Sequence, residues 1–129
     1  MVEVASGVCV HLLDPIPGVV IARVTDALRD LGHRVELRGQ SFSAGAARIP
    51  VETILEHGDA SVGMTDLYLT SRPLDSRAGG SIRGAASSDG TSAIVGVPKA
   101  PRRDRFKPEF ANRVLGRVLR QLGRLHPQA

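Results

Sequence analysis

The chain has 129 residues, of which 42% are hydrophobic and 23% charged. These values favour one compact domain over 1–129 and exclude a disordered chain or two independent domains. Aromatic residues make up only 3%, so few side chains can stack on nucleic-acid bases. We therefore expect no sequence-specific nucleic-acid recognition.

The formal net charge of +4 is unevenly placed. Residues 1–98 hold eight basic and eleven acidic side chains, whereas residues 99–129 hold nine and two. Such a basic segment favours an anionic partner, although a solvated basic helix face explains it equally well. No apolar run reaches the roughly 20 residues of a membrane helix, and no leader pattern is present. We therefore expect a cytoplasmic protein with no membrane partner.

The first third of the chain predicts a strand, a helix and a second strand. An apolar run over 8–13 is typical of a strand. Apolar residues at helical spacing then predict a helix over 19–31, which Gly32 ends. Alternation of polar and apolar residues predicts the second strand over 33–38.

Turn residues and periodicity divide the rest of the chain. In order, they predict a loop over 39–47, a short helix over 50–57, a strand over 60–69, turns over 71–80, strands over 81–86 and 91–97, a basic connector without regular structure over 98–107 and a long helix over 108–125. Asp89-Gly90 predicts a hairpin between the last two strands. The expected fold is α/β (α+β), a mixed, partly parallel sheet with a β-hairpin, packed by two helices and the long C-terminal helix.

The long helix is the most regularly patterned segment. One broad side collects the apolar residues Phe110, Val114, Leu115, Val118, Leu119 and Leu122, and we expect this side to pack on the sheet. A narrow stripe on another side collects Arg113, Arg117, Arg120 and Arg124.

Cysteine and histidine spacing predicts no metal ligand and no cofactor. Cys9 is the single cysteine, which excludes an intrachain disulfide and a cysteine-cluster zinc site. The four histidines show no close metal spacing. Cys9 and His11 share one face of the first predicted strand, but such a pair is more typical of packing than of a metal or nucleophilic site.

Two stretches resemble the archaemetzincins, a zinc metallopeptidase-like family with the metzincin fold. Gly63-Met64-Thr65-Asp66-Leu67-Tyr68 resembles that family's Gly, apolar, Thr, Asp-Leu-Tyr stretch, and Ala93-Ile94-Val95-Gly96-Val97 resembles the strand before its active-site helix. The likeness is collinear with the strand over 8–13 and the segment over 48–55. It implies a zincin-like fold and a single truncated metallopeptidase-like domain.

The same resemblance implies that the zinc mechanism is lost. The family's active-site helix carries His-Glu-x-x-His, Gly and a third His, which bind zinc and activate its water. In the best register Arg120, Gln121 and Arg124 occupy the positions of the first His, the Glu and the second His. Guanidinium groups have no lone pair for zinc and an amide is no carboxylate base. Pro127 stands at the Gly position, and the third His would fall beyond Ala129.

We therefore transfer no catalytic residue and expect a noncatalytic pseudoenzyme, a binding or accessory protein that recognises an acidic small molecule or an extended peptide. The anion-binding residues would be Arg120, Arg124, Gln121 and Arg117. The alternative is a metal-independent enzyme in which Arg120 and Arg124 orient an anionic substrate in the former cleft. Attachment of the basic segment to another subunit and self-association also stay open.

Asp66 and Tyr68 are a further polar pair in the family-like stretch. For Asp66 we expect the ordinary role of a carboxylate at a strand end that caps a turn.

Overall fold

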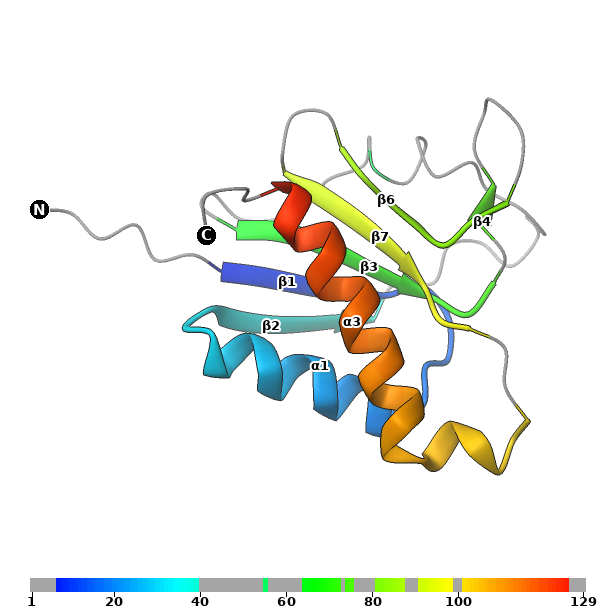
Figure 1. Cartoon of the computed structure of the whole chain (residues 1–129). Coiled ribbons are helices and arrows are strands. Elements are labelled where there is room, and N and C mark those ends of the chain that lie inside the picture. Colours follow the sequence, from blue (N-terminus) through cyan, green and yellow to red (C-terminus); the bar gives the residue numbers. More distant parts are fainter. Residues whose placement is uncertain are drawn as a thin grey trace, which may run out of the picture.

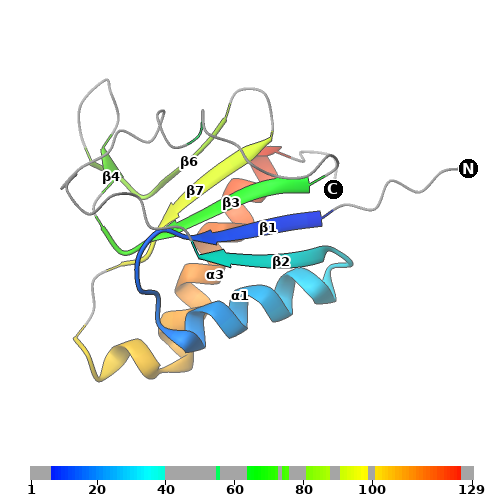
Figure 2. The same cartoon turned by 180° about the vertical axis from the view of Figure 1, so that it is seen from behind.

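The computed structural model describes residues 7–39, 55, 64–72, 74–75, 81–87, 91–98 and 101–125. A five-stranded sheet carries two helices on one face (Figure 1), and the view from behind shows the face away from both helices (Figure 2). The helices are α1 (Gly18–Asp30) and α3 (Pro108–Leu125). The strands of the sheet are β1 (Gly7–Leu12), β2 (Arg34–Gly39), β3 (Met64–Thr70), β6 (Gly84–Ala86) and β7 (Ser92–Gly96).

The sheet is mixed and mostly parallel, as the sequence predicts. Its strands lie in the order β2-β1-β3-β7-β6, and the first four run parallel while β6 pairs antiparallel with β7 at the edge. A parallel sheet needs crossover connections, and α1 supplies the one between β1 and β2. The antiparallel pairing of β6 and β7 confirms the predicted hairpin, while its Asp89-Gly90 turn lies outside the described residues.

Strand alternation sends one set of apolar side chains toward the helices. Val8 and Val10 of β1 and Leu67 and Leu69 of β3 are fully buried on this face. The core between sheet and helices includes Val8, Val10, Val20, Val24, Leu28, Leu67, Leu69, Val95, Phe110, Val114, Val118 and Leu122. Each buried aliphatic side chain stabilises the fold by about 1.5–3 kcal/mol relative to exposure.

Helix packing follows the predicted periodicity with one exception. Phe110, Val114, Val118 and Leu122 recur every fourth residue along α3 and are all buried. Leu119 is 40% exposed, so the expectation that it packs on the sheet is wrong. Leu115 lies one turn earlier on the same side of α3 and is buried, so this side of the helix is covered at Leu115 and uncovered at Leu119.

The segment over 71–86 departs from the predicted turn-and-strand pattern. A two-stranded antiparallel pair, β4 (Leu74–Asp75) with β5 (Ser81–Ile82), stands apart from the main sheet. The predicted strand over 81–86 is therefore broken at Arg83, because its first part pairs with β4 and its second part with β7.

Other predicted elements differ at their ends or cannot be compared. The connector before α3 contains a short 3-10 turn, η1 (Asp104–Phe106). The predicted loop over 39–47 and short helix over 50–57 fall outside the described residues except for Gly39, the last residue of β2, and Leu55. Within the described segments, neither helix has the length and apolarity to span a membrane.

Candidate functional site

Four arginines gather where α3 passes the edge of the sheet. Arg113, Arg117 and Arg120 recur four and three residues apart, so they share one side of α3. Gly96 of β7 connects this side to the bend at Arg83, because its N–H donates to the Arg83 carbonyl at 2.8 Å and its carbonyl accepts from Arg117 Nη1 at 2.8 Å. We call Arg83, Arg113, Arg117 and Arg120 the arginine cluster.

The cluster is electrostatically unbalanced. Partial burial and the neighbouring charges of Arg83, Arg113 and Arg120 lower the pKa of Arg117. Among the described residues, no acidic side chain forms an ion pair with any of the four. Arg83, Arg113 and Arg120 are exposed, whereas Arg117 is half-buried. The cluster is therefore a solvent-accessible group of positive charges, and at its Arg113 end the acidic residues Asp104 and Glu109 line the same pocket as Arg113.

Gln121 and Arg124, the other two residues of the predicted anion site, are not part of the arginine cluster. Gln121 is buried against the edge strand, and its Nε2 lies 3.0 Å from where a Cβ of Gly84 would be. The amide is thus packed beneath β6 instead of facing a ligand. Arg124 belongs to α3, but its side chain lies outside the described residues.

Replacement of Gly84 by alanine is expected to destabilise this edge. The added Cβ would lie 2.9 Å from the Ile94 carbonyl oxygen and 3.0 Å from Gln121 Nε2, so β6 or Gln121 must move. We expect Gly84→Ala to lower the free energy of unfolding by about 1–3 kcal/mol in urea titrations. The matched control is Gly116→Ala on the exposed side of α3, where nothing lies within 4 Å. The free energy of unfolding of Gly116→Ala should rise by up to about 1 kcal/mol. Equal effects of both substitutions would contradict the close approach at Gly84.

Asp66 and Tyr68 lie on the opposite face of the sheet from α3. Their neighbours Leu67 and Leu69 pack in the helix-side core, so Asp66 and Tyr68 point the other way. The structure therefore does not bring the Asp66–Tyr68 pair together with the arginine cluster.

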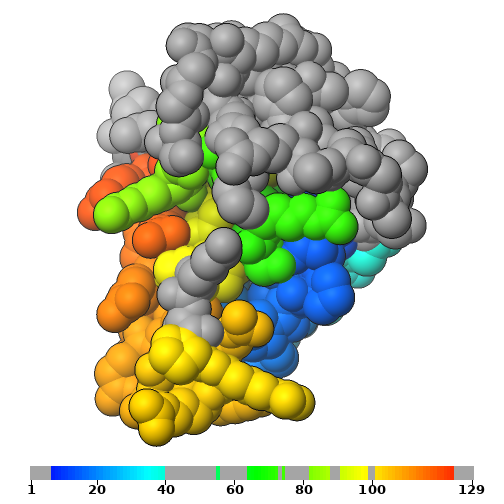
Figure 3. All heavy atoms as spheres, turned by 90° about the vertical axis from the view of Figure 1, so that its right-hand side faces the viewer, coloured from blue at the N-terminus to red at the C-terminus, as the bar shows by residue number. Residues whose placement is uncertain are grey.

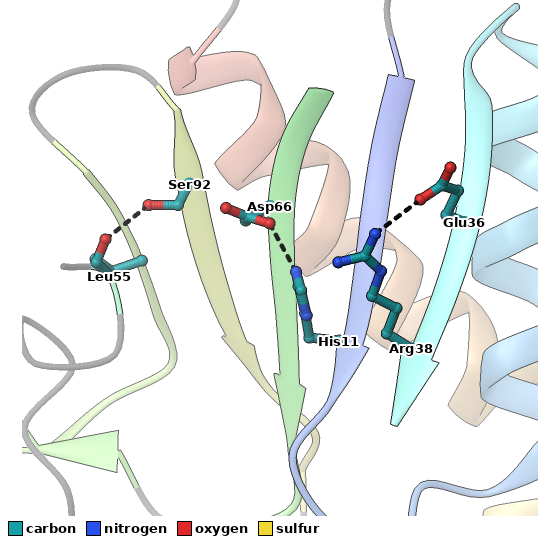
Figure 4. Close-up of polar contacts among 6 residues, drawn as sticks. All are labelled: His11, Glu36, Arg38, Leu55, Asp66 and Ser92. Atoms are coloured by element: carbon teal, nitrogen blue, oxygen red, sulfur yellow. Dashed lines mark hydrogen bonds and ion pairs between the residues drawn. The ribbon is translucent and has the colours of Figure 1, made fainter. Parts of the chain in front are cut away.

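Asp66 is a buried residue within β3, and the prediction that it caps a turn at a strand end is wrong. Its Oδ1 accepts a hydrogen bond from His11 Nε2 at 2.6 Å, and the His11 ring stacks on Tyr68 with ring centroids 4.5 Å apart (Figure 4). The parallel register explains the contact, because β1 and β3 place Cys9 beside Asp66 and His11 beside Tyr68.

On the sheet face away from the helices, side chains are buried on β3 and β7 and partly exposed on β2. Asp66 and Ser92 are buried, and the Ser92 hydroxyl donates to the Leu55 carbonyl at 3.2 Å. On β2, Glu36 and Arg38 form a partly exposed ion pair at 3.4 Å (Figure 4). Periodicity correctly predicts that Cys9 and His11 share a face, but the only sequence signal for the partnership with Asp66 is the alternation of polar side chains along β3.

A third feature is a hollow at the carboxyl ends of β1, β3 and β7, on the side that Figure 3 shows. Its volume is about 520 Å³. The lining residues are Pro15, Pro17, Ser71, Val97, Pro98, Pro101, Arg105 and Phe110. Asp14 closes the strand ends by accepting hydrogen bonds from the Thr70 hydroxyl and from the Ser71 amide and hydroxyl. This hollow is separate from both the arginine cluster and the His11–Asp66 pair, and no sequence motif marked it.

Solved structures with the same fold are archaemetzincins and a zinc-dependent peptidase. The archaemetzincin from Methanopyrus kandleri is 20% identical with a TM-score of 0.70, over 93% of this chain and 72% of that chain. The archaemetzincin from Archaeoglobus fulgidus, solved in complex with malonate, is 12% identical with a TM-score of 0.73, over 92% and 77%. The zinc-dependent peptidase from Methanocorpusculum labreanum is 14% identical with a TM-score of 0.62, over 92% and 80%.

These likenesses confirm the archaemetzincin-like fold and the expected fold class. No family model matches the sequence, and no curated protein matches it significantly. At these identities the solved structures speak for the fold alone.

Proposed function

On the premise of an archaemetzincin-like fold, we propose that this chain is a noncatalytic binding protein whose arginine cluster holds an acidic ligand. The convergence of four arginines without an acidic partner among the described residues carries this proposal. Guanidinium groups bind carboxylates through parallel N–H donors, and several of them around one site raise both affinity and geometric selectivity.

Zinc does not fit α3. An active-site helix of a zinc peptidase supplies two histidines one turn apart and a glutamate between them. From Pro108 to Leu125 this helix contains no histidine or cysteine, and its one acidic residue, Glu109, lies in the first turn. Arg120 and Gln121 offer neither a zinc ligand nor a carboxylate base. We therefore derive no zinc-dependent step for α3.

The position of the cluster supports recognition of an extended acidic ligand. Arg83 adjoins the edge strand β6, and Arg117 is held in place by the Gly96 carbonyl of β7. An edge strand offers backbone hydrogen bonds to an extended peptide, while the arginines would contact its carboxylates. The archaemetzincin from Archaeoglobus fulgidus was solved with malonate, a small dicarboxylate, which makes malonate a suitable first probe.

We favour binding over metal-independent catalysis because the arginine cluster supplies no group that transfers a proton. Gln121 is packed beneath β6 and supports neither hypothesis. The remaining arginines bind and neutralise an anion but hold no proton to transfer near neutral pH.

Isothermal titration with malonate tests the proposal. In low salt with a chelator present, we expect saturable binding that weakens as salt rises. Arg120→Ala should weaken binding by about tenfold, which corresponds to about 1.4 kcal/mol. The control is Arg29→Ala. Arg29 is an exposed residue of α1 outside the cluster, and its Nη1 lies 3.9 Å from Asp26 Oδ1. No saturable binding, or equal losses in the two variants, would refute the proposed site.

A further inference from the structure

Three side chains of types that bind metal ions meet on the sheet face away from the helices. Cys9 and His11 come from β1, and Asp66 comes from β3. A thiol sulfur, an imidazole nitrogen and a carboxylate oxygen from these residues all lie within 4.8 Å of one another. The sequence showed no metal spacing because the third residue is 55 positions from His11 along the chain.

The dimensions of this cluster suit one small cation. Zinc binds sulfur at about 2.3 Å and nitrogen or oxygen at about 2.0–2.2 Å, so its ligand atoms stand roughly 3–4 Å apart. A cation held between His11 Nε2 and Asp66 Oδ1, now 2.6 Å apart, would replace their hydrogen bond and move these two atoms apart, whereas donors as far apart as 4.8 Å would move closer. The parallel register holds Cys9 beside Asp66, so the backbone already sets two of the donors as neighbours.

Hydrogen bonding inside the protein leaves the cluster incompletely satisfied. His11 is fully buried, and its Nε2 is bonded to Asp66. Its second ring nitrogen, Nδ1, has no hydrogen-bond partner among the described residues. A buried polar atom without a partner costs about 1–3 kcal/mol, which is unusual in a well-packed sheet. A polar partner that the described residues do not supply is therefore expected beside His11.

We propose that Cys9, His11 and Asp66 form a binding site for one divalent cation of the zinc class. The donor set of sulfur, nitrogen and oxygen selects a borderline-soft ion over calcium or magnesium, which require oxygen ligands. Binding converts the Cys9 thiol to a thiolate, forms the sulfur–metal bond and releases the thiol proton to solvent. Ligation through His11 Nε2 replaces its hydrogen bond to Asp66, and the ring proton moves from Nε2 to Nδ1. This site is independent of the arginine cluster, because it lies on the other face of the sheet.

Cobalt binding to the whole, reduced, metal-free chain tests the site. Cys9 is the only cysteine, so a thiolate-to-Co²⁺ charge-transfer band identifies it without any variant. We expect this band to saturate at one equivalent and to disappear when Zn²⁺ is added. Because the cluster is buried, the chain is also refolded from urea with Co²⁺ present. No saturable binding, or binding without the thiolate band, would overturn the proposal.

Variants then separate the site from general packing. Cys9→Ala should abolish the band and lower Zn²⁺ affinity by more than the roughly 10- to 100-fold that loss of an outer-shell partner costs. Asp66→Asn should weaken binding while it keeps the shape of the side chain. Ser92→Ala is the control, since Ser92 is buried on the same face but lies outside the cluster. Unchanged Zn²⁺ affinity in folded Cys9→Ala, or equal losses in all three variants, would contradict the assignment.

Discussion

Asp66→Ala is expected to lower the free energy of unfolding by about 3 kcal/mol or more, measured in a chelator so that metal binding makes no contribution. The Asp66 side chain is 3% exposed and its His11 partner is fully buried. Removal of the carboxylate leaves a buried imidazole with neither ring nitrogen bonded among the described residues. It also opens a cavity beside the stacked Tyr68 ring.

Urea unfolding followed by circular dichroism measures this loss. Asp66→Asn should lower the free energy of unfolding by less than half as much as Asp66→Ala, because the amide oxygen still accepts a hydrogen bond from His11. Ser92→Ala removes one buried hydroxyl whose partner is the Leu55 carbonyl, and should cost about 1 kcal/mol. A loss below about 1 kcal/mol for Asp66→Ala would contradict a structural role of the His11–Asp66 contact.

Charge reversal at two positions of the arginine cluster is expected to abolish malonate binding. In Arg117→Glu/Arg120→Glu, two carboxylates face Arg83 and Arg113, so the patch loses its excess positive charge. The carboxylate introduced at position 117 also cannot donate to the Gly96 carbonyl, as Arg117 does at 2.8 Å. We expect affinity to fall by about 100-fold or more, which corresponds to at least about 2.7 kcal/mol.

The matched control makes the same change of formal charge elsewhere. Arg102 and Arg103 are exposed residues of the connector before η1. Arg102→Glu/Arg103→Glu should weaken binding only through the general field of the protein, an effect that salt screens. Titrations of both variants at matched salt distinguish the two causes. Equal losses would mean that net charge, and not the arginine cluster, controls the interaction.

Much of the fold can be predicted from local patterns. Val20, Val24 and Leu28 recur along α1, and the same periodicity marks α3, so both helices follow from side-chain spacing. The family-like stretches around Asp66 and Ile94 fall on the central strands β3 and β7. Features that depend on partners in space were not predicted. The break at Arg83 depends on pairing with both β4 and β7, and the exposure of Leu119 depends on where neighbouring elements stop covering α3.

The candidate sites show the same division. Helical spacing correctly groups Arg117 with Arg120, but the contribution of Arg83 arises through hydrogen bonds to Gly96 that no sequence pattern marks. Likewise, alternation places Cys9 and His11 on one face, while the contact with Asp66 requires the pairing of β1 with β3. Local periodicity finds residues on one element, and strand pairing decides which elements meet.

Nuclear magnetic resonance of the arginine Nε–Hε groups during a malonate titration tests the central claim most directly. If the arginine cluster binds the acidic ligand, the signals of Arg117 and Arg120 shift and saturate together, those of Arg83 and Arg113 follow, and Arg29 stays unchanged. Saturating shifts that leave Arg117 and Arg120 unaffected, or equal small shifts at every arginine, would contradict the claim.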